Sequence, residues 1–211
     1  SLEAVIGPSI GGLMALEFCT MYPEYVKKLI SISSGYKLST LQTLHNLEQA
    51  YILDLGRESN NRNSEYLSLA RMVAHKTYIS LELLSNRAKS ETLYDDGLIK
   101  GFLSTPQESY MMHQGEKFIE RFTPESYLSI IKGWQNFKIE QKDLNKLKDI
   151  ETLVISVDSD VCFYPEEQKE FLEILNNHEI RTTYTTINST KGHDSFLLEP
   201  ELFEDTLKNF L

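Results

Sequence analysis

The segment that most constrains the fold is a strand-like run near the start of the chain that turns abruptly into a helix. Residues 2–6 are mostly apolar, residues 7–12 read Gly-Pro-Ser-Ile-Gly-Gly, and apolar residues then recur at helical spacing up to Pro23. Such a glycine-rich break marks a tight turn between two elements. A second apolar run at residues 29–33 is closed by Gly35. Together these segments predict a β-α-β unit, in which the two strands are parallel.

A second unit of the same kind is predicted near the end of the chain. Residues 153–157 and 182–187 are short runs rich in β-branched residues, which favour strands. Between them Pro165 opens a helical pattern, and proline is common at the first position of a helix. The two β-α-β units predict an α/β protein with a mostly parallel sheet.

The middle of the chain is predicted to be helical. Its apolar residues recur at three- and four-residue steps, as they do around Trp134, and Thr123 precedes a proline in the manner of a helix start. We therefore divide the chain into an α/β core of residues 1–38 and 149–211 and a helical insertion of residues 39–148.

Composition limits the partners of the chain. Its 211 residues carry 21 Lys and Arg against 31 Asp and Glu, a net charge of −10, so the long-range field repels nucleic acids and anionic lipid surfaces. No run approaches the roughly 18 apolar residues that a membrane-spanning helix needs, and the first residues lack the basic region of a signal peptide. Cys19 and Cys162 form no CxxC pair, which argues against a disulfide framework or a metal site. We expect a cytoplasmic protein that binds no metal, no nucleic acid and no membrane.

The pentapeptide Gly7-Pro8-Ser9-Ile10-Gly11 matches the pattern G-x-S-x-G. Between a strand and a helix this pattern is typical of a nucleophile elbow, in which the serine lies on a strained turn and the flanking glycines avoid collisions. The amide of Ile10 would then donate to an oxyanion at the N-terminus of the helix. A glycine-rich turn with an inert serine is the alternative interpretation.

A serine hydroxyl is a poor nucleophile near neutral pH, so it needs a base that a carboxylate orients. In proteins with such an elbow the three residues follow in the order Ser, Asp, His. Asp160 follows the predicted strand 153–157 and His193 follows the predicted strand 182–187. Both therefore belong to the carboxyl edge of the sheet, where such sheets place ligands. Asp158 is a second candidate for the acid, although we prefer Asp160.

Other reactive residue types receive more ordinary interpretations. Asp194, beside the predicted base, is either a helix cap or a substrate contact. Cys162 is close to the acid loop, and we expect it to be a buried packing residue. The remaining histidines are expected to be solvated or capping residues: His45, His75, His113 and His178.

Several separated blocks of the sequence follow one another in the order of a known family. The blocks are residues 7–17 (GPSIGGLMALE), 69–78 (LARMVAHKTY), 109–118 (SYMMHQGEKF), 121–123 (RFT), 159–160 (SD), 165–168 (PEEQ) and 192–197 (GHDSFL). They resemble the homoserine O-acetyltransferase family of the α/β-hydrolase superfamily. The resemblance runs essentially from end to end of the chain, and several blocks in one order are more specific than a triad pattern alone.

The resemblance implies an α/β-hydrolase-type sheet with an inserted helical lid and a two-step acyl transfer. Ser9 would take an acetyl or similar acyl group from acetyl-CoA, the co-substrate, and the hydroxyl of L-homoserine would then remove it, a step of methionine biosynthesis. His193 would act as the base in both halves, with Asp160 holding its tautomer. By motif position, Arg71 would meet the carboxylate of the amino acid and Asp194 its ammonium group. No bound cofactor is implied.

The resemblance also implies roles for the helical region of residues 39–148. An acyl-serine hydrolyses in water, so a lid that shields it while admitting a second alcohol suits a transferase. Family members pair through this region. We therefore expect a homodimer, to which the apolar stripe around Trp134 is one contributor.

The chain differs from the family before the elbow. Eight residues precede Ser9, whereas the family implies a long N-terminal part with early strands and a second oxyanion amide. A fragment, a natural truncation or completion by a partner chain would each account for this. We expect residues 2–6 to form an exposed edge of the sheet. We also expect the chain alone to be poorly active, because one oxyanion donor is worth about two or more orders of magnitude in turnover.

Two further functions stay open on the sequence alone. The first is an esterase of the same fold, in which water deacylates Ser9. A shared fold does not separate the two reactions, but Arg71 and Asp194 favour an amino acid as acceptor. The second is an inactive, truncated domain. The acyl group, acetyl or succinyl, and the accepting alcohol also stay open.

Overall fold

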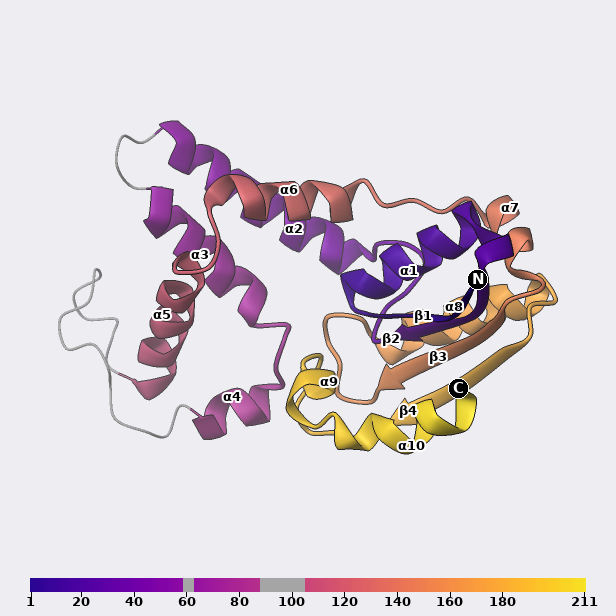
Figure 1. Ribbon diagram of the computed structural model, residues 1–211. Coiled ribbons are helices and arrows are strands. Elements are labelled where there is room, and N and C mark those ends of the chain that lie inside the picture. Colours follow the sequence, from indigo (N-terminus) through magenta and orange to yellow (C-terminus); the bar gives the residue numbers. More distant parts are fainter. Residues whose placement is uncertain (59–62, 88–104) are drawn as a thin grey trace. The chain divides into compact units, whose positions relative to one another are not determined.

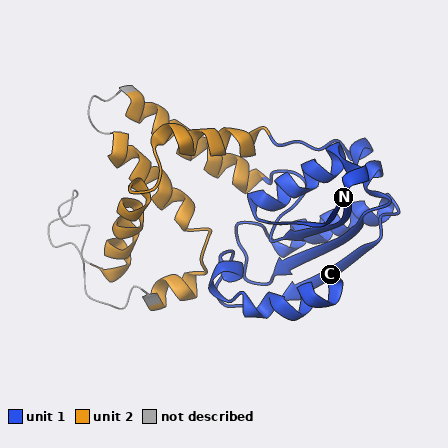
Figure 2. Ribbon diagram, in the orientation of Figure 1, with its two compact units in different colours: residues 1–39, 137–211 blue, residues 40–136 orange. Residues whose placement is uncertain are grey.

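The computed structural model describes residues 1–58, 63–87 and 105–211 (Figure 1). These residues divide into two compact units (Figure 2). The first consists of Ser1–Ser39 with Phe137–Leu211, and the second of Thr40–Asn136. Each unit contains a hydrophobic cluster of its own.

The first unit is built on a four-stranded sheet in the order β1-β2-β3-β4, and each neighbouring pair is parallel. The strands are β1 (Leu2–Pro8), β2 (Val26–Ile32), β3 (Glu151–Val157) and β4 (Thr182–Ile187). Pro8 lies opposite Ile32, and Val157 lies opposite Ile187. The prediction of a parallel sheet is therefore confirmed, and its carboxyl ends are level.

Helices connect the strands in the manner that parallel pairing requires. The helical segments of this unit are α1 (Ile10–Met21), η1 (Pro23–Tyr25), α7 (Gln141–Leu144), η2 (Asn145–Leu147), α8 (Pro165–Asn177), α9 (Ser195–Leu198) and α10 (Glu201–Phe210). α1 joins β1 to β2, and α8 joins β3 to β4. Both predicted β-α-β units are confirmed, with Pro165 at the first turn of α8.

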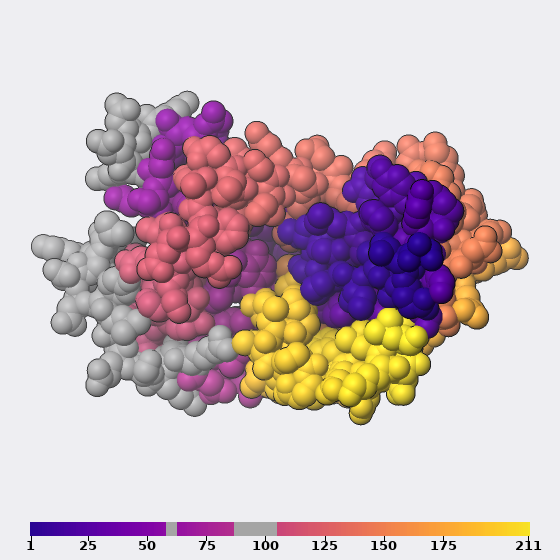
Figure 3. Space-filling view, in the orientation of Figure 1, coloured from indigo at the N-terminus to yellow at the C-terminus, as the bar shows by residue number. Residues whose placement is uncertain are grey.

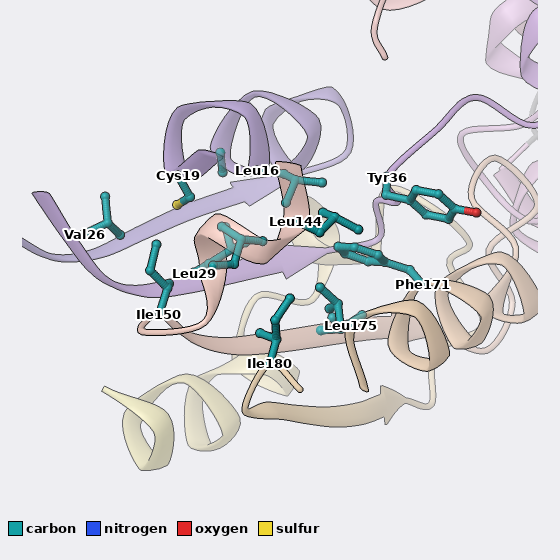
Figure 4. Packing of buried hydrophobic residues seen from close by; sticks show 13 residues of the cluster. Leu16, Cys19, Val26, Leu29, Tyr36, Leu144, Ile150, Phe171, Leu175 and Ile180 are labelled. Carbon is teal, nitrogen blue, oxygen red and sulfur yellow. The ribbon is translucent and has the colours of Figure 1, made fainter. Parts of the chain in front are cut away.

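Both faces of the sheet are covered, because successive residues of a strand point to opposite faces. Leu29 of β2 belongs to a cluster with side chains of α1, η2 and α8, as Figure 4 shows. The next residue, Ile30, belongs to a second cluster that includes Phe203 of α10. Phe171 of α8 is fully buried in the first cluster and stacks on Tyr36. The result is a three-layer arrangement of helices, sheet and helix.

The boundary of the sheet unit differs from the one drawn on the sequence. Residues 137–148, which were assigned to the helical insertion, belong to the first unit. Leu144 and Leu147 are fully buried in the cluster that also holds Leu29. The residues around these leucines are polar and helix-forming, so the local sequence predicts that the leucines belong to the insertion. Only long-range packing shows that they belong to the sheet unit.

β1 is an edge strand of the described sheet, as predicted. Leu2 and Ile6 of this strand are 47% and 46% exposed, and Met14 of the following helix α1 is also exposed. Figure 3 shows this N-terminal segment in indigo on the surface beside the C-terminal residues in yellow. Lys28 of β2 ties the C-terminal residues to the sheet, because its Nζ donates to the carbonyl oxygens of Phe210 and Leu211 at 2.6 and 2.9 Å.

The second unit is helical in every described element. It contains α2 (Thr40–Glu58), α3 (Asn63–His75), α4 (Leu81–Arg87), α5 (Pro106–Ile119) and α6 (Pro124–Gln135). The predicted starts at Thr105 and Thr123 are confirmed, and each threonine side chain accepts from a backbone N–H two residues past the proline. Residues 59–62 and 88–104 of the predicted insertion lie outside the described residues. Among the described ranges, no helix combines the length and apolar character needed to cross a bilayer.

Candidate active site

Ser9 lies on a sharp turn between the end of β1 and the start of α1. Its backbone has φ 55° and ψ −131°, a conformation that L-residues rarely adopt and that costs about 1–3 kcal/mol. Its amide donates to the carbonyl of Ile32 at the end of β2, and its carbonyl accepts from the amide of Gly12, both at 2.9 Å. The surrounding strand and helix therefore hold the strained residue in place.

Two glycines make this turn possible, and they are not the pair expected from the pentapeptide. A Cβ at Gly7 would lie 2.0 Å from the carbonyl oxygen of Gly11, and a Cβ at Gly12 would lie 2.5 Å from the Ser34 side chain. A Cβ at Gly11 would meet only an ordinary contact, Pro8 Cδ at 3.5 Å. The collision argument is thus right for Gly7 and wrong for Gly11, since the crowded residue of α1 is Gly12.

The structure brings Ser9, His193 and Asp160 together at the carboxyl edge of the sheet. His193 Nε2 lies 2.8 Å from Ser9 Oγ, and His193 Nδ1 lies 2.8 Å from Asp160 Oδ2. Asp160 accepts from Nδ1–H, which leaves Nε2 as the acceptor for the serine hydroxyl. This is the arrangement in which an imidazole can take the proton of a serine nucleophile.

Asp160 is held by its own loop, which follows β3. Its Oδ1 accepts from the backbone amides of Cys162 and Phe163 at 2.8 and 2.9 Å. With His193 on Oδ2, the buried carboxylate has three N–H partners. The rival acid Asp158 has another task, since its Oδ1 accepts from the amide of Ser189 at 3.0 Å. The preference for Asp160 over Asp158 as the partner of the imidazole agrees with this geometry.

The imidazole of His193 is enclosed and almost fully buried, with 3% of the residue exposed. The ring of Phe163 stacks on it at 5.5 Å between centroids, and the ring of Phe196 meets it edge-on at 5.5 Å. Burial alone lowers the pKa of His193, but the charge and hydrogen bond of Asp160, together with the charge of Asp194, outweigh burial and raise the pKa above its ordinary 6.5.

Ile10 is the first residue of α1, directly after Ser9. The first four amides of an α-helix have no partner within the helix, and the helix dipole favours negative charge at that end. The amide of Ile10 is therefore the type of N–H group that can donate a hydrogen bond to a developing oxyanion. Its role as an oxyanion donor stays a prediction.

The two residues predicted to bind the amino acid lie in different units. Asp194 stands at the N-cap position of α9, but its side chain does not cap that helix. It is near enough to His193 to influence the pKa of the imidazole. Arg71 lies on α3 of the second unit, and its guanidinium stands over the rings of Tyr78 and Phe118 at 4.8 Å from each centroid. Aromatic faces on a guanidinium fix its plane and leave its N–H edge for a carboxylate.

The other candidate nucleophiles and bases are two cysteines and four histidines. Cys19 and Cys162 are both buried, and burial raises the pKa of Cys19 to about 12. His178 follows α8 and its Nδ1 pairs with Asn145. The other three histidines are on helices of the second unit: His45, His75 and His113. Within the described part of the chain, no group of three or more His, Cys, Asp or Glu side chains is placed to hold a metal ion.

The sequence analysis assigned no role to three residues that support the base. Phe163 and Phe196 enclose the imidazole, and Ser159 hydrogen-bonds to the loop that carries His193. Their positions carry a weak signal, since Ser159 directly precedes the predicted acid, Phe163 lies three residues after that acid, and Phe196 lies three residues after the predicted base. Proximity in sequence alone does not tell which neighbours turn toward the ring.

A serine on a strained strand-to-helix turn, a histidine after the last strand and an aspartate after the strand between them define a protein of the α/β-hydrolase fold. Solved structures agree with this class. Homoserine O-acetyltransferase from Bacillus anthracis superposes with a TM-score of 0.86 at 17% identity, over 99% of this chain and 59% of that chain. Esterase E22 superposes with a TM-score of 0.87 at 17% identity, over all of this chain and 61% of that one.

Sequence comparison finds relatives that share one name. In an alignment of 225 positions, the chain is 35% identical to homoserine O-acetyltransferase of Methanosalsum zhilinae. The alignment covers all of this chain and 45% of the relative. All of this sequence is thus similar to part of known homoserine O-acetyltransferases, in line with the resemblance. The chain spans about half the length of the curated relatives it matches. No family profile matches the sequence.

The two glycines of the pentapeptide should respond differently to substitution. Gly7→Ala places a methyl group 2.0 Å from backbone, so we expect a loss of about 3 kcal/mol or more in unfolding free energy. Gly11→Ala meets only Pro8 Cδ at 3.5 Å and should change stability by less than about 1 kcal/mol. Urea denaturation followed by circular dichroism measures both. Equal losses would contradict the assignment of the crowding to Gly7.

The raised pKa of His193 predicts how the site responds to pH. A protonated imidazole cannot take the serine proton, so labelling of Ser9 by a fluorophosphonate should decline as the pH falls through a value above 6.5.

The same shift contributes folding stability that is fully present below the pKa of the unfolded state and is lost as the pH rises through the pKa of the folded state. An NMR titration of the ring, assigned with His193→Gln, reports the pKa directly. A titration at or below 6.5 would show that Asp160 does not outweigh burial.

Proposed function

We propose that Ser9, His193 and Asp160 are the nucleophile, base and acid of an acyltransferase that moves an acetyl group from acetyl-CoA to the hydroxyl of L-homoserine. The observation that carries the proposal is the pair of 2.8 Å contacts that link Ser9 to His193 and His193 to Asp160. Similarity to homoserine O-acetyltransferases along the whole chain supports the choice of substrates.

In the first half of the reaction, Ser9 Oγ attacks the thioester carbonyl while His193 Nε2 takes the hydroxyl proton. The oxygen of the tetrahedral intermediate becomes negative and is stabilised by the amide of Ile10 and the N-terminus of α1. The carbon–sulfur bond then breaks, and the imidazolium returns its proton to the departing thiolate of CoA. An acetyl-serine remains.

In the second half, the hydroxyl of L-homoserine replaces CoA. His193 takes its proton as the oxygen attacks the acetyl-serine, and the imidazolium then protonates Ser9 as the ester bond to the enzyme breaks. Arg71 would bind the carboxylate of the amino acid in a bidentate manner, and Asp194 would bind its ammonium group. The orientation of both groups would favour homoserine over water as the acceptor.

The helical unit would supply the shielding that this chemistry needs. An acetyl-serine exposed to water is lost to hydrolysis, so residues 40–136 are proposed to act as a lid. The relatives' name refers to acetylation of the amino acid homoserine, and the proposal places this reaction in methionine biosynthesis, with the cytoplasm as its location.

A homodimer through the helical unit is also proposed, although by a different surface from the one expected. Trp134 is buried, with 7% exposed, so the stripe around it is no exposed patch. α2 instead carries apolar side chains that are 43–62% exposed at steps of three and four residues: Leu44, Leu47, Tyr51 and Leu55. A partner copy would cover this stripe. Sedimentation at several protein concentrations tests for the dimer.

Acyl transfer and ester hydrolysis predict different fates for the acetyl-serine. With acetyl-CoA alone, mass spectrometry should find an acetyl group on the Ser9 peptide, and addition of L-homoserine should remove it and yield O-acetylhomoserine. Ser9→Ala should abolish both, whereas Ser156→Ala, a nearby serine of β3, should abolish neither. Thiol release that is indifferent to homoserine would indicate an esterase. A folded chain that never acquires the acetyl group would indicate an inactive domain.

Arg71 provides a test of the proposed acceptor. Arg71→Lys keeps the charge but loses bidentate geometry, so we expect the KM for homoserine to rise about 10-fold or more, with acetylation of Ser9 by acetyl-CoA unchanged. The matched control is Arg121→Lys, another arginine of the helical unit whose guanidinium lies over the ring of Phe122. If both variants weaken homoserine use equally, Arg71 has no special part in binding it.

A further inference from the structure

The loop that carries His193 is tied to the acid loop by more than the triad contact. Ser159 Oγ donates a hydrogen bond to the carbonyl oxygen of Ser189 and accepts one from the amide of Gly192 at 3.0 Å. A hydroxyl has one donor and can accept as well, so a single side chain closes both ends of the segment between Ser189 and Gly192. This segment ends immediately before His193.

The hydrogen bond from Gly192 to Ser159 restrains the backbone directly before His193. The φ of 78° at Gly192 lies in the left-handed region, which glycine adopts without steric strain and other residues do not. While its amide is held by Ser159, its carbonyl oxygen accepts from the amide of Ser195 at 3.1 Å. The residue directly before His193 is therefore fixed on both sides, by the acid loop and by the start of α9.

Neighbouring contacts brace the far end of the same loop. The carboxylate of Asp158 accepts from the amide of Ser189 at 3.0 Å, and Ser189 Oγ donates to Glu199 at 2.6 Å. The amide of Lys191 donates to Ser189 Oγ at 3.0 Å. These bonds hold Ser189, whereas the bond from Ser159 to Gly192 is adjacent to the base itself.

Such bracing matters because His193 stands on a loop and not within a strand or a long helix. Its Nε2 must stay 2.8 Å from Ser9 Oγ while Nδ1 stays 2.8 Å from Asp160. A displacement of about 1 Å at a catalytic group can cost about 100-fold in rate, and sites whose supporting contacts are loose lose activity in this way.

We propose that Ser159 is a positioning residue for His193, fixing the backbone of the base loop through Gly192 while the adjacent Asp160 fixes the imidazole. One dipeptide of the acid loop would thus set both the location and the tautomer of the base. The proposal rests on the proposed function in one respect, namely that Ser9 is the nucleophile which His193 serves.

Ser159→Ala in the 211-residue chain tests this proposal with two independent readouts. We expect the rate of Ser9 labelling by a fluorophosphonate to fall about 10- to 100-fold. We also expect the pKa of His193, followed by NMR, to move down toward its ordinary value as the pairing with Asp160 loosens. Ser159→Thr keeps the hydroxyl and should stay close to the unsubstituted chain in both readouts.

The matched control is Ser156→Ala. Ser156 lies three residues earlier on β3 and also has two hydroxyl partners, Tyr184 and Thr186, but neither is on the base loop. It should leave labelling and the pKa of His193 unchanged even if it lowers stability. The proposal is overturned if Ser159→Ala behaves like the unsubstituted chain, if Ser156→Ala has the same effects, or if Ser159→Thr is as impaired as Ser159→Ala. If a folded unsubstituted chain is never labelled, the proposed function fails, and the pKa of His193 still decides the role of Ser159.

Discussion

The parallel register of β1 to β4 determines where this chain can carry out chemistry. Ser9 and His193 are 184 positions apart in sequence, yet each follows the carboxyl end of a strand, and level strand ends bring the two side chains into contact. Asp160 reaches the same edge from β3. Because the sheet is packed on both faces, the ends of its strands are rigid supports. The strained backbone of Ser9 is tolerated because β2 holds its amide.

The buried pair of Asp160 and His193 follows a second constraint. The two residues are only 1% and 3% exposed, and a carboxylate in such a place is costly unless hydrogen bonds and an opposite charge compensate it. Amides of Cys162 and Phe163 and the Nδ1–H of the imidazole supply three such hydrogen bonds. The loop after β3 is therefore shaped around its acid. This explains why the neighbouring Asp158, which lacks these amides, instead holds the base loop.

The sequence predicts the strands and the order of the triad because both depend on local signals: apolar β-branched runs, a glycine-rich break, and polar residues just after strands. It predicts poorly what long-range packing decides. The crowding at Gly12 comes from Ser34, beyond the following strand. Leu144 and Leu147 join the sheet unit although their surroundings read as insertion. Periodicity likewise shows that Trp134 lies on an apolar helix face, but it does not show whether that face packs inside the chain or against a partner; in the structure Trp134 is buried.

The choice between acyl transfer and hydrolysis depends on groups outside the triad, because the contacts of Ser9, His193 and Asp160 serve either fate of an acyl-serine equally. A transferase would need a place for the second substrate, which the proposed function assigns to Arg71 and Asp194. Arg71 has a guanidinium whose plane two aromatic rings fix, and such a group recognises a carboxylate with little further loss of freedom. Asp194 adds a negative charge next to the base. Under the proposed function, Arg71 would bind the carboxylate and Asp194 the ammonium group of an amino alcohol, whereas water would use neither residue. Discrimination between acceptors is then expected in the binding of homoserine and not in the rate at which Ser9 becomes acylated.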